Sequence, residues 1–78
     1  MPVVLRSGPY SFFFYAGDGG EPPYVHVRRD SAVAKYWISP VRLSSHKNFN
    51  AVELKRLERI ITGNQRKLQE SWDEYFNN

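Results

Sequence analysis

The sequence predicts an α+β fold, in which about four strands of a mainly antiparallel sheet (ββββ) are followed by one long C-terminal helix. In the first half of the 78 residues, short apolar runs alternate with period two, and Gly, Pro, Asp or Ser residues separate them. After Asn50, apolar residues recur at helical spacing. A chain this short forms a single domain, 1–78, in which we expect a β-half with a linker over 1–49 and a helix over 50–76.

The first two predicted strands differ in how much of their surface is apolar. The first is a short run, 3–5, which ends at the turn residues Ser7-Gly8-Pro9. The second, 10–15, carries aromatic residues on both faces: Tyr10, Phe12 and Phe14 on one, Phe13 and Tyr15 on the other. A strand that is apolar on both faces is usually central in its sheet and covered on each side.

The third and fourth predicted strands, 24–29 and 33–38, alternate more simply. Val25 and Val27 face one way in the third strand, and the other face carries Tyr24, His26 and Arg28. In the fourth strand the two faces are Val33, Lys35 and Trp37 against Ala34, Tyr36 and Ile38. The connections are short, which indicates antiparallel hairpins. Residues 39–49 read as a linker, with a small fifth strand at 41–43 as an option.

The predicted helix begins at Asn50, a good N-cap, with Glu53 three residues later as in a capping box. Its apolar positions are Leu54, Leu57, Ile61, Leu68, Trp72 and Tyr75. This phase holds across Gly63 and favours one helix of about 40 Å, with a kink at Gly63 left open. Such a helix outreaches the sheet, so we expect its aromatic end to overhang: Trp72, Tyr75 and Phe76. We expect Trp72 and Phe76 to lie at a homodimer or partner interface, together with one aromatic pair of the second strand: Phe13 and Tyr15, or Phe12 and Phe14.

Composition and charge narrow the class of protein. There is no cysteine, which fits a reducing compartment. No apolar run is long enough for a membrane span, and the start, 1–6, is too short and too soon charged for a signal peptide, so we expect a cytoplasmic protein. The net charge is +3. Basic residues dominate the β-half and the start of the helix, whereas Glu70, Asp73 and Glu74 make the end acidic. This distribution is compatible with nucleic acid or an acidic protein as partner.

Catalytic and metal-binding motifs are absent from the sequence: there is no Cys, HExxH, Walker A or GxSxG pattern. His26 and His46 are the two histidines, and with Asp18, Glu21 or Asp30 they could ligate a metal in principle. No ligand spacing supports such a site. We therefore expect no metal and no cofactor.

One group of residues stands above this background, on the strand that follows Pro22-Pro23. Tyr24, His26 and Arg28 project from one face at spacings near 7 Å, and we expect all three to be at least partly exposed. We also expect Arg6 or Lys35 from neighbouring strands nearby. A ring that can stack, a group that titrates near neutral pH and a fixed cation suit RNA binding. They also suit acid–base cleavage of a phosphodiester by His26, and they are compatible with an ordinary solvated strand face.

A second basic group lies on the predicted helix, where Lys55, Arg59 and Arg66 form a row. Lys55 and Arg59 are like charges at i,i+4, and Arg66 has an internal partner in Glu70. The row is either a contact for phosphate or acidic side chains, or plain solvated surface.

The sequence also resembles a small bacterial family, domain of unknown function four-one-six-zero, along nearly its whole length. The resemblance rests on segments 1–10, 12–15, 21–23 with 25–27, 35–37, 40–43 and 72–76, which read MPVVLRSGPY, FFFY, EPP with VHV, KYW, PVRL and WDEYF. Members are often encoded beside another small protein in pairs that look like toxin–antitoxin modules. The resemblance thus implies a cognate protein partner.

One position departs from the family pattern. The two prolines are usually followed by His-Val-His-Val, and here Tyr24 replaces the first histidine while His26 matches the second. An acid–base or metal-binding histidine pair would be impaired by this change, whereas a stacking role tolerates tyrosine. The departure favours binding over catalysis.

These observations lead to one preferred function and two alternatives. We expect a component of a two-gene, toxin–antitoxin-like module that engages RNA or its cognate protein through the sheet face around Tyr24, His26 and Arg28. The alternatives are a metal-independent ribonuclease that uses His26, and a structural partner protein without a nucleic-acid ligand.

Overall fold

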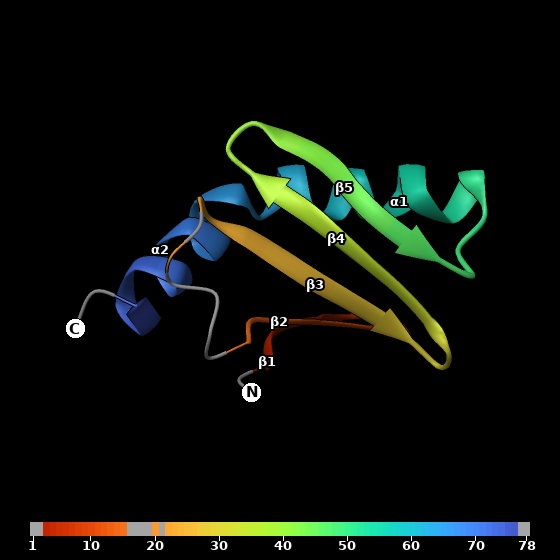
Figure 1. The fold of residues 1–78 in the computed structure, drawn as a ribbon, viewed down its shortest axis with the longest axis horizontal. Helices are drawn as coiled ribbons and strands as arrows, with labels where there is room; N and C mark the ends of the chain where they lie inside the picture. The colour runs from red at the N-terminus through yellow and green to blue at the C-terminus, as the bar shows by residue number, and fades with distance from the viewer. Residues whose placement is uncertain (1–2, 16–19, 21, 77–78) are drawn as a thin grey trace.

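A computed structural model describes residues 3–15, 20 and 22–76 of the chain. Within these residues a sheet is followed by two helices (Figure 1). The strands are β1 (Val3–Ser7), β2 (Tyr10–Phe13), β3 (Tyr24–Arg29), β4 (Ala32–Ile38) and β5 (Val41–Lys47), and the helices are α1 (Ala51–Gly63) and α2 (Gln65–Phe76). The α+β class is confirmed, but the described chain has five strands and two helices where four and one were predicted.

The strands follow one another across the sheet in the order of the chain, and each pairs antiparallel with the next. The predicted hairpin connections are therefore confirmed. Two of the tight turns contain residues with positive φ, Gly8 at 57° between β1 and β2 and Asp30 at 54° between β3 and β4. These are residue types that adopt this backbone conformation more readily than most.

Strand β5 is the part of the sheet that the sequence pattern predicted least well. It continues to Lys47, well beyond the short segment 41–43, and Val33 of β4 stands opposite Lys47. β5 is an edge strand, and all its residues after Val41 are exposed. A strand with so little buried surface needs no apolar alternation, and polar residues at an edge discourage pairing with other chains. This explains why the segment reads as a linker.

The prediction of a single helix is wrong, because the helix is interrupted at Asn64, between α1 and α2. The backbone N–H of Asn64 bonds to the carbonyl of Ile61 at 3.1 Å and its side chain donates to the carbonyl of Ile60 at 2.8 Å, which ends α1. The carbonyl of Asn64 then accepts from the N–H of Leu68 in the first turn of α2. The chain bends here instead of continuing straight past the sheet (Figure 1).

The start of α1 agrees with the sequence. The side chain of Asn50 accepts a hydrogen bond from the backbone N–H of Glu53 at 2.8 Å, as an N-cap should. The carboxylate of Glu53, by contrast, binds Arg29 of β3. The half of the predicted capping box in which the Asn50 side chain accepts from Glu53 is therefore formed. In place of the other half, the Glu53 side chain makes a tertiary contact with Arg29.

Both helices lie behind the same face of the sheet, which we call the inner face (Figure 1). Leu57, Ile61 and Leu68 are fully buried there, in one cluster with Val25 and Val27. The predicted helix face is confirmed from Leu54 to Trp72, but not at Tyr75, which is exposed. Tyr36 is also fully buried, and its hydroxyl donates to the carbonyl of Leu54 at 2.8 Å. Burial raises the pKa of Tyr36 to about 12, with a smaller contribution from the negative charge of Glu58.

The expected overhang does not occur at Trp72 and Phe76, whereas Tyr75 is exposed. Because the chain bends at Asn64, Trp72 is only 4% exposed. Its ring centroid lies 5.2 Å from that of Phe14, and the Phe76 ring packs on Trp72 at 4.2 Å between centroids. Phe12 and Phe14 are fully buried within the chain. These rings therefore need no second chain to cover them, and a homodimer stays a prediction.

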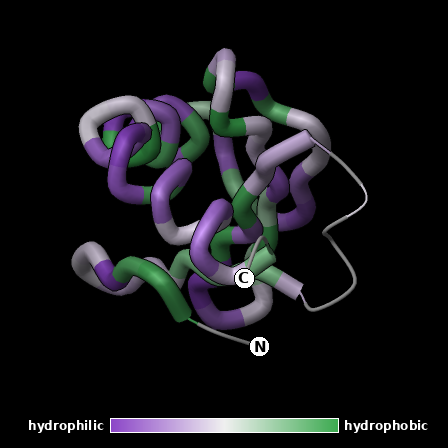
Figure 2. The backbone as a smooth tube through the Cα atoms, turned by 90° about the vertical axis from the view of Figure 1, so that its left-hand side faces the viewer, coloured by the Kyte–Doolittle hydropathy of each residue, from purple (hydrophilic) through white to green (hydrophobic). Residues whose placement is uncertain are grey.

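The other edge of the sheet is formed by β1. Figure 2 shows its start, directly after the N-terminus, as a hydrophobic stretch. Val3 is exposed, and Val4 and Leu5 pack in part against the core. Among the described residues, neither helix is long and apolar enough to cross a membrane.

Candidate functional site

The face of the sheet opposite the helices, here called the outer face, is defined by strand register. Tyr24 pairs with Trp37, His26 with Lys35 and Arg28 with Val33, and paired residues project to the same side. The pairs with β2 and β5 extend these rows. The outer face comprises Val3, Arg6, Ser11, Phe13, Tyr24, His26, Arg28, Val33, Lys35, Trp37, Arg42, Ser45 and Lys47. The two predicted groupings of β4 residues are confirmed by its alternating burial.

The charged strand residues on this face are all basic. None of the five strands contains Asp or Glu. The outer face carries the cations Arg6, Arg28, Lys35, Arg42 and Lys47, and all of these are exposed except Lys35, which is half-buried. The remaining strand cation, Arg29, belongs to the inner side. The strands therefore present a basic surface without an acidic group of their own.

At the centre of the outer face, His26 lies among aromatic rings. Phe13 stacks on it with 5.4 Å between centroids, and the rings of Tyr15 and Tyr24 meet it edge-on at 4.4 and 5.1 Å. His26 is half-buried, and its Nε2 atom is buried. Phe13 is 4% exposed, whereas Tyr15 is 42% exposed. The aromatic residues on the second face of the 10–15 segment thus form a small cluster of their own, with Tyr15 at its surface.

Tyr24 was expected to be exposed, and this expectation is wrong. Its side chain is 3% exposed because α2 bends at Asn64 and brings Trp72 to 5.5 Å, and the Lys35 ammonium lies 3.9 Å from the Tyr24 ring centroid. A straight helix would have left this end of β3 open. Tyr24 therefore packs against Lys35 and His26 as a buried residue, and its ring is not available for a ligand to stack on.

The other predicted members of the site lie on the outer face. Arg28 is exposed, with its guanidinium 5.8 Å from the Phe13 ring centroid. Arg6 reaches the same row through Ser11, to whose hydroxyl it donates at 3.2 Å. Lys35 stands opposite His26. The structure thus brings Arg6, His26, Arg28 and Lys35 onto one surface.

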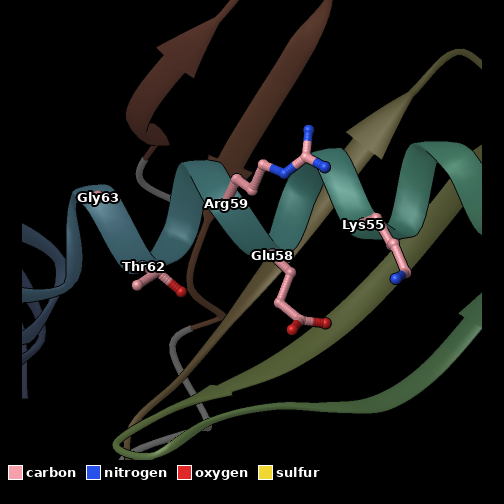
Figure 3. Close-up of a pocket in the computed structure, with 5 residues that line it drawn as sticks. All are labelled: Lys55, Glu58, Arg59, Thr62 and Gly63. Carbon is pink, nitrogen blue, oxygen red and sulfur yellow. The ribbon is translucent and has the colours of Figure 1, made fainter.

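The basic row on the helices is separate from this surface. Lys55 and Arg59 line a surface pocket on α1 together with Glu58, Thr62 and Gly63, and Figure 3 shows Arg59 directed away from Lys55 and Glu58. Arg66 lies beyond the break, on α2, and pairs with Glu70 at 3.6 Å, as predicted from their spacing. Lys55, Arg59 and Arg66 do not form one continuous strip, and they do not join the outer face.

Among the outer-face residues that were not proposed as site residues from the sequence, three carry an indole or a positive charge: Trp37, Arg42 and Lys47. Trp37 is half-buried and pairs across the strands with exposed Arg42. Trp37 could have been included among the site residues, because period-two alternation in the fourth predicted strand already placed it on the same face as Lys35. Arg42 and Lys47 lie on β5, whose polar sequence gave no strand signal beyond residue 43.

The inner side holds a charged cluster of a different kind. Arg29 donates to both carboxylate oxygens of Glu53, at 2.7 and 2.9 Å, and the hydroxyl of Tyr10 donates to the same carboxylate at 3.1 Å. The Arg29 hydrogen bond holds the pKa of the Glu53 carboxyl below its ordinary value, against an opposing effect of desolvation, and Glu53 in turn raises the pKa of Arg29. This fully paired cluster ties β3 to the start of α1.

A metal site is not evident in the part of the chain that the structure describes, where no three His, Asp or Glu side chains gather. His46 is exposed on β5, and Asp30 lies in the turn after β3. The other two carboxylates that could have joined them, Asp18 and Glu21, lie outside the described residues.

A family model described as "Domain of unknown function (DUF4160)" matches residues 10–73, which include β2 to β5 and most of both helices. No curated protein and no solved structure matches the chain.

Proposed function

This chain belongs to the family described as Domain of unknown function (DUF4160), and from that premise we propose that it is the RNA-binding component of a two-gene, toxin–antitoxin-like module. Its ligand is single-stranded RNA, and the binding surface is the outer face of the sheet. The observation that carries the proposal is the set of five cations on that face, where no strand contributes a carboxylate.

The arrangement of the cations favours a polymer over a small anion. Neighbouring strands are about 4.8 Å apart, and alternate residues of one strand about 7 Å apart, so the five cations are spread across the sheet. A single phosphate could contact only one or two of them. A nucleic-acid strand places a negative charge on every nucleotide and can contact several at once, releasing counterions as it binds.

The aromatic residues favour a single strand over a duplex. Tyr15 is exposed and Trp37 half-buried on a face that otherwise offers cations. Unpaired bases stack on such rings, whereas the bases of a duplex are already stacked on each other. Arg28, beside the Phe13 ring, offers a further planar group of positive charge.

Binding fits the environment of His26 better than cleavage does. A general base must reach the proton that it removes, to within about 3 Å. The Nε2 atom of His26 is buried, and Phe13 covers one face of the ring. The His26 ring therefore serves the outer face as a packing group, between the aromatic cluster and the cations.

The test is fluorescence anisotropy with a labelled, mixed-sequence 12-nucleotide RNA, measured over a range of salt concentrations. The informative variant is Arg28→Gln/Lys35→Gln/Arg42→Gln, which removes three outer-face cations. Its matched control, Lys55→Gln/Arg59→Gln/Arg66→Gln, removes three cations from the helices and has the same net charge. We expect the sheet variant to bind at least tenfold more weakly and to lose roughly two units of salt slope, at about 0.7 per phosphate contact, while the control stays near wild type.

Several outcomes would contradict the proposal. Equal loss in both variants would mean unspecific attraction by net charge, and loss only in the helix variant would relocate the site to α1 and α2. If the wild type binds no RNA at low salt but co-purifies with the product of a neighbouring gene, the outer face is a protein interface instead. Cleavage of RNA in the presence of chelator, abolished in His26→Ala, would replace binding with the ribonuclease alternative.

A further inference from the structure

At one end of the outer face, its last row of residues meets two proline-containing segments. A pocket there is lined by Pro22, Pro23, Trp37, Ser39, Pro40 and Arg42. The prolines come from the segment before β3 and from the turn between β4 and β5. We propose that this pocket, the Trp37 pocket, is a slot for one nucleotide of the RNA, with the base stacked on Trp37 and the phosphate held by Arg42. The inference rests on the proposed function and adds to it a site for a base.

The walls of the Trp37 pocket are held in place by the fold. The backbone N–H of Ile38 donates to the carbonyl of Pro23 at 3.2 Å, which joins the segment before β3 to the end of β4. The carbonyl of Ile38 accepts from the side chain of Gln65 at 2.7 Å, which attaches the same point to α2. Proline rings lose little conformational freedom on binding a ligand, since their φ is already restricted. The pocket is therefore preformed, which lowers the entropic cost of binding.

Trp37 is positioned as an aromatic wall. Its indole packs edge-on against Tyr24, with 5.5 Å between centroids, and Tyr24 is in turn held by Trp72. Yet Trp37 remains half-exposed, on the pocket that it lines. A ring that is supported from within the protein and open to solvent can accept a flat aromatic ligand by stacking.

The charges around the pocket select an anionic ligand. Arg42, which lines it, is exposed, and the Lys35 ammonium lies 4.9 Å from the Trp37 centroid. Within the described part of the chain, every charged residue that lines this pocket or contacts Trp37 is a cation. A nucleotide satisfies both requirements, because it joins an aromatic base to a phosphate. A proline-rich peptide could also pack against Trp37 and the prolines, but its prolines bring no negative charge to Arg42.

Continuity with the rest of the outer face supports the same ligand. The Trp37–Arg42 row is followed, two residues along the strands, by the row of His26 and Lys35, and then by the row of Arg28. Each row contributes at least one cation. A strand of RNA that leaves the Trp37 pocket can therefore cross the face over successive phosphate contacts.

The experiment compares a ligand that has bases with one that has none. Binding of the 12-nucleotide RNA and of inorganic polyphosphate is measured for the wild type, Trp37→Leu and Tyr75→Leu. Tyr75 is an aromatic residue of α2 that is 42% exposed and does not line the pocket, and it serves as the matched control. We expect Trp37→Leu to weaken RNA binding roughly 5- to 150-fold, the range that loss of one base stack gives. Its polyphosphate affinity and its salt slope should stay at the wild-type values.

Arg42→Gln provides the complementary measurement. Loss of a phosphate contact should weaken RNA and polyphosphate binding alike and reduce the salt slope for RNA by roughly 0.7. If instead Arg42→Gln leaves both affinities unchanged, the phosphate assignment within the pocket is wrong.

The outcomes separate this inference from the proposed function. If the wild type binds neither RNA nor polyphosphate, the proposed function fails. If it binds both, and Trp37→Leu weakens neither or weakens both equally, only the base slot is overturned. A proline-rich peptide that displaces the RNA and binds more weakly to Trp37→Leu would assign the pocket to a peptide. Should Trp37→Leu not fold, quenching of tryptophan fluorescence decides, since Trp72 is 4% exposed and Trp37 faces solvent: quenching by RNA but not by polyphosphate supports the slot, and its absence overturns it.

Discussion

The two faces of the sheet are built from the same strands, yet they use charged and aromatic residues in opposite ways. On the inner face, the strand cation Arg29 is bound by both oxygens of Glu53, and the aromatic residues Phe12, Phe14 and Tyr36 are fully buried beneath the helices. On the outer face, five cations surround His26 and Phe13, and no strand supplies a carboxylate.

This difference shows how a chain of 78 residues divides its surface between stability and binding. A domain of this size has a small core and cannot leave inner-face groups unpaired without losing much of its stability. The outer face is free of that demand, because charged groups in contact with water contribute little to stability whether they are paired or not. Mutations on the two faces should therefore have different effects.

The largest effect on stability should come from the inner face at Leu57. Leu57→Ala removes a fully buried side chain between α1 and the sheet, and we expect it to lower the free energy of unfolding by about 2–5 kcal/mol. Urea unfolding followed by circular dichroism measures this. Val52→Ala, at a 68% exposed position of the same helix, is the control and should change stability by no more than about 0.5 kcal/mol. Equal stability of Leu57→Ala and wild type would mean that the core is misplaced.

The next effect concerns the ion pair that joins the inner face to α1. The Arg29 hydrogen bond lowers the pKa of Glu53 in the folded protein. A carboxyl with a lower pKa in the folded than in the unfolded state stabilises the protein above its unfolded pKa, and this contribution is lost as the pH falls through the folded pKa. We expect the urea midpoint of the wild type to fall as the pH drops below about 5, and that of Glu53→Gln to fall less.

The control for this second prediction is Glu58→Gln, since Glu58 is exposed on the same helix. Urea midpoints are compared at several pH values for the three proteins. If Glu53→Gln and wild type lose stability in parallel as the pH falls, Glu53 does not link pH to stability, and the ion pair is no stronger than a surface pair.

A smaller loss is expected at the N-cap of α1. Asn50→Ala removes the hydrogen bond from the Glu53 N–H and should lower the free energy of unfolding by about 1 kcal/mol. Asn50→Asp keeps an acceptor at this position and should be close to wild type. If both variants lose the same amount, Asn50 acts through something other than its capping bond.

The smallest effect on stability should occur on the outer face. Arg28→Ala removes an exposed side chain that passes near the Phe13 ring, and we expect a change within about 0.5 kcal/mol. The same variant should bind RNA more weakly, with a salt slope lower by roughly 0.7. A loss of stability comparable to that of Leu57→Ala would show that the outer face is part of the structural core, and the contrast between the faces would then disappear.

The candidate site could be predicted in part. Period-two alternation assigned His26, Arg28 and Lys35 to one face and Val25 and Val27 to the other, because the apolar residues must be buried and their neighbours then point away. It failed at Tyr24, since alternation describes a strand and its sheet but not a helix that bends over the strand end. It also missed Arg42 and Lys47, because an edge strand exposed on both sides carries no apolar pattern.

The sequence by itself determined the α+β class, the hairpin order of its first four strands, the apolar helix face and the N-cap at Asn50, because each depends on residues close together in the chain. The tertiary structure decided the rest. It pairs Val41–Lys47 with β4, it bends the helix at Asn64 so that Trp72 is buried, and it directs Glu53 to Arg29. It also places Trp37, Arg42 and the prolines around one pocket. These features join segments that are distant in sequence, and local patterns carry no information about which of them will meet.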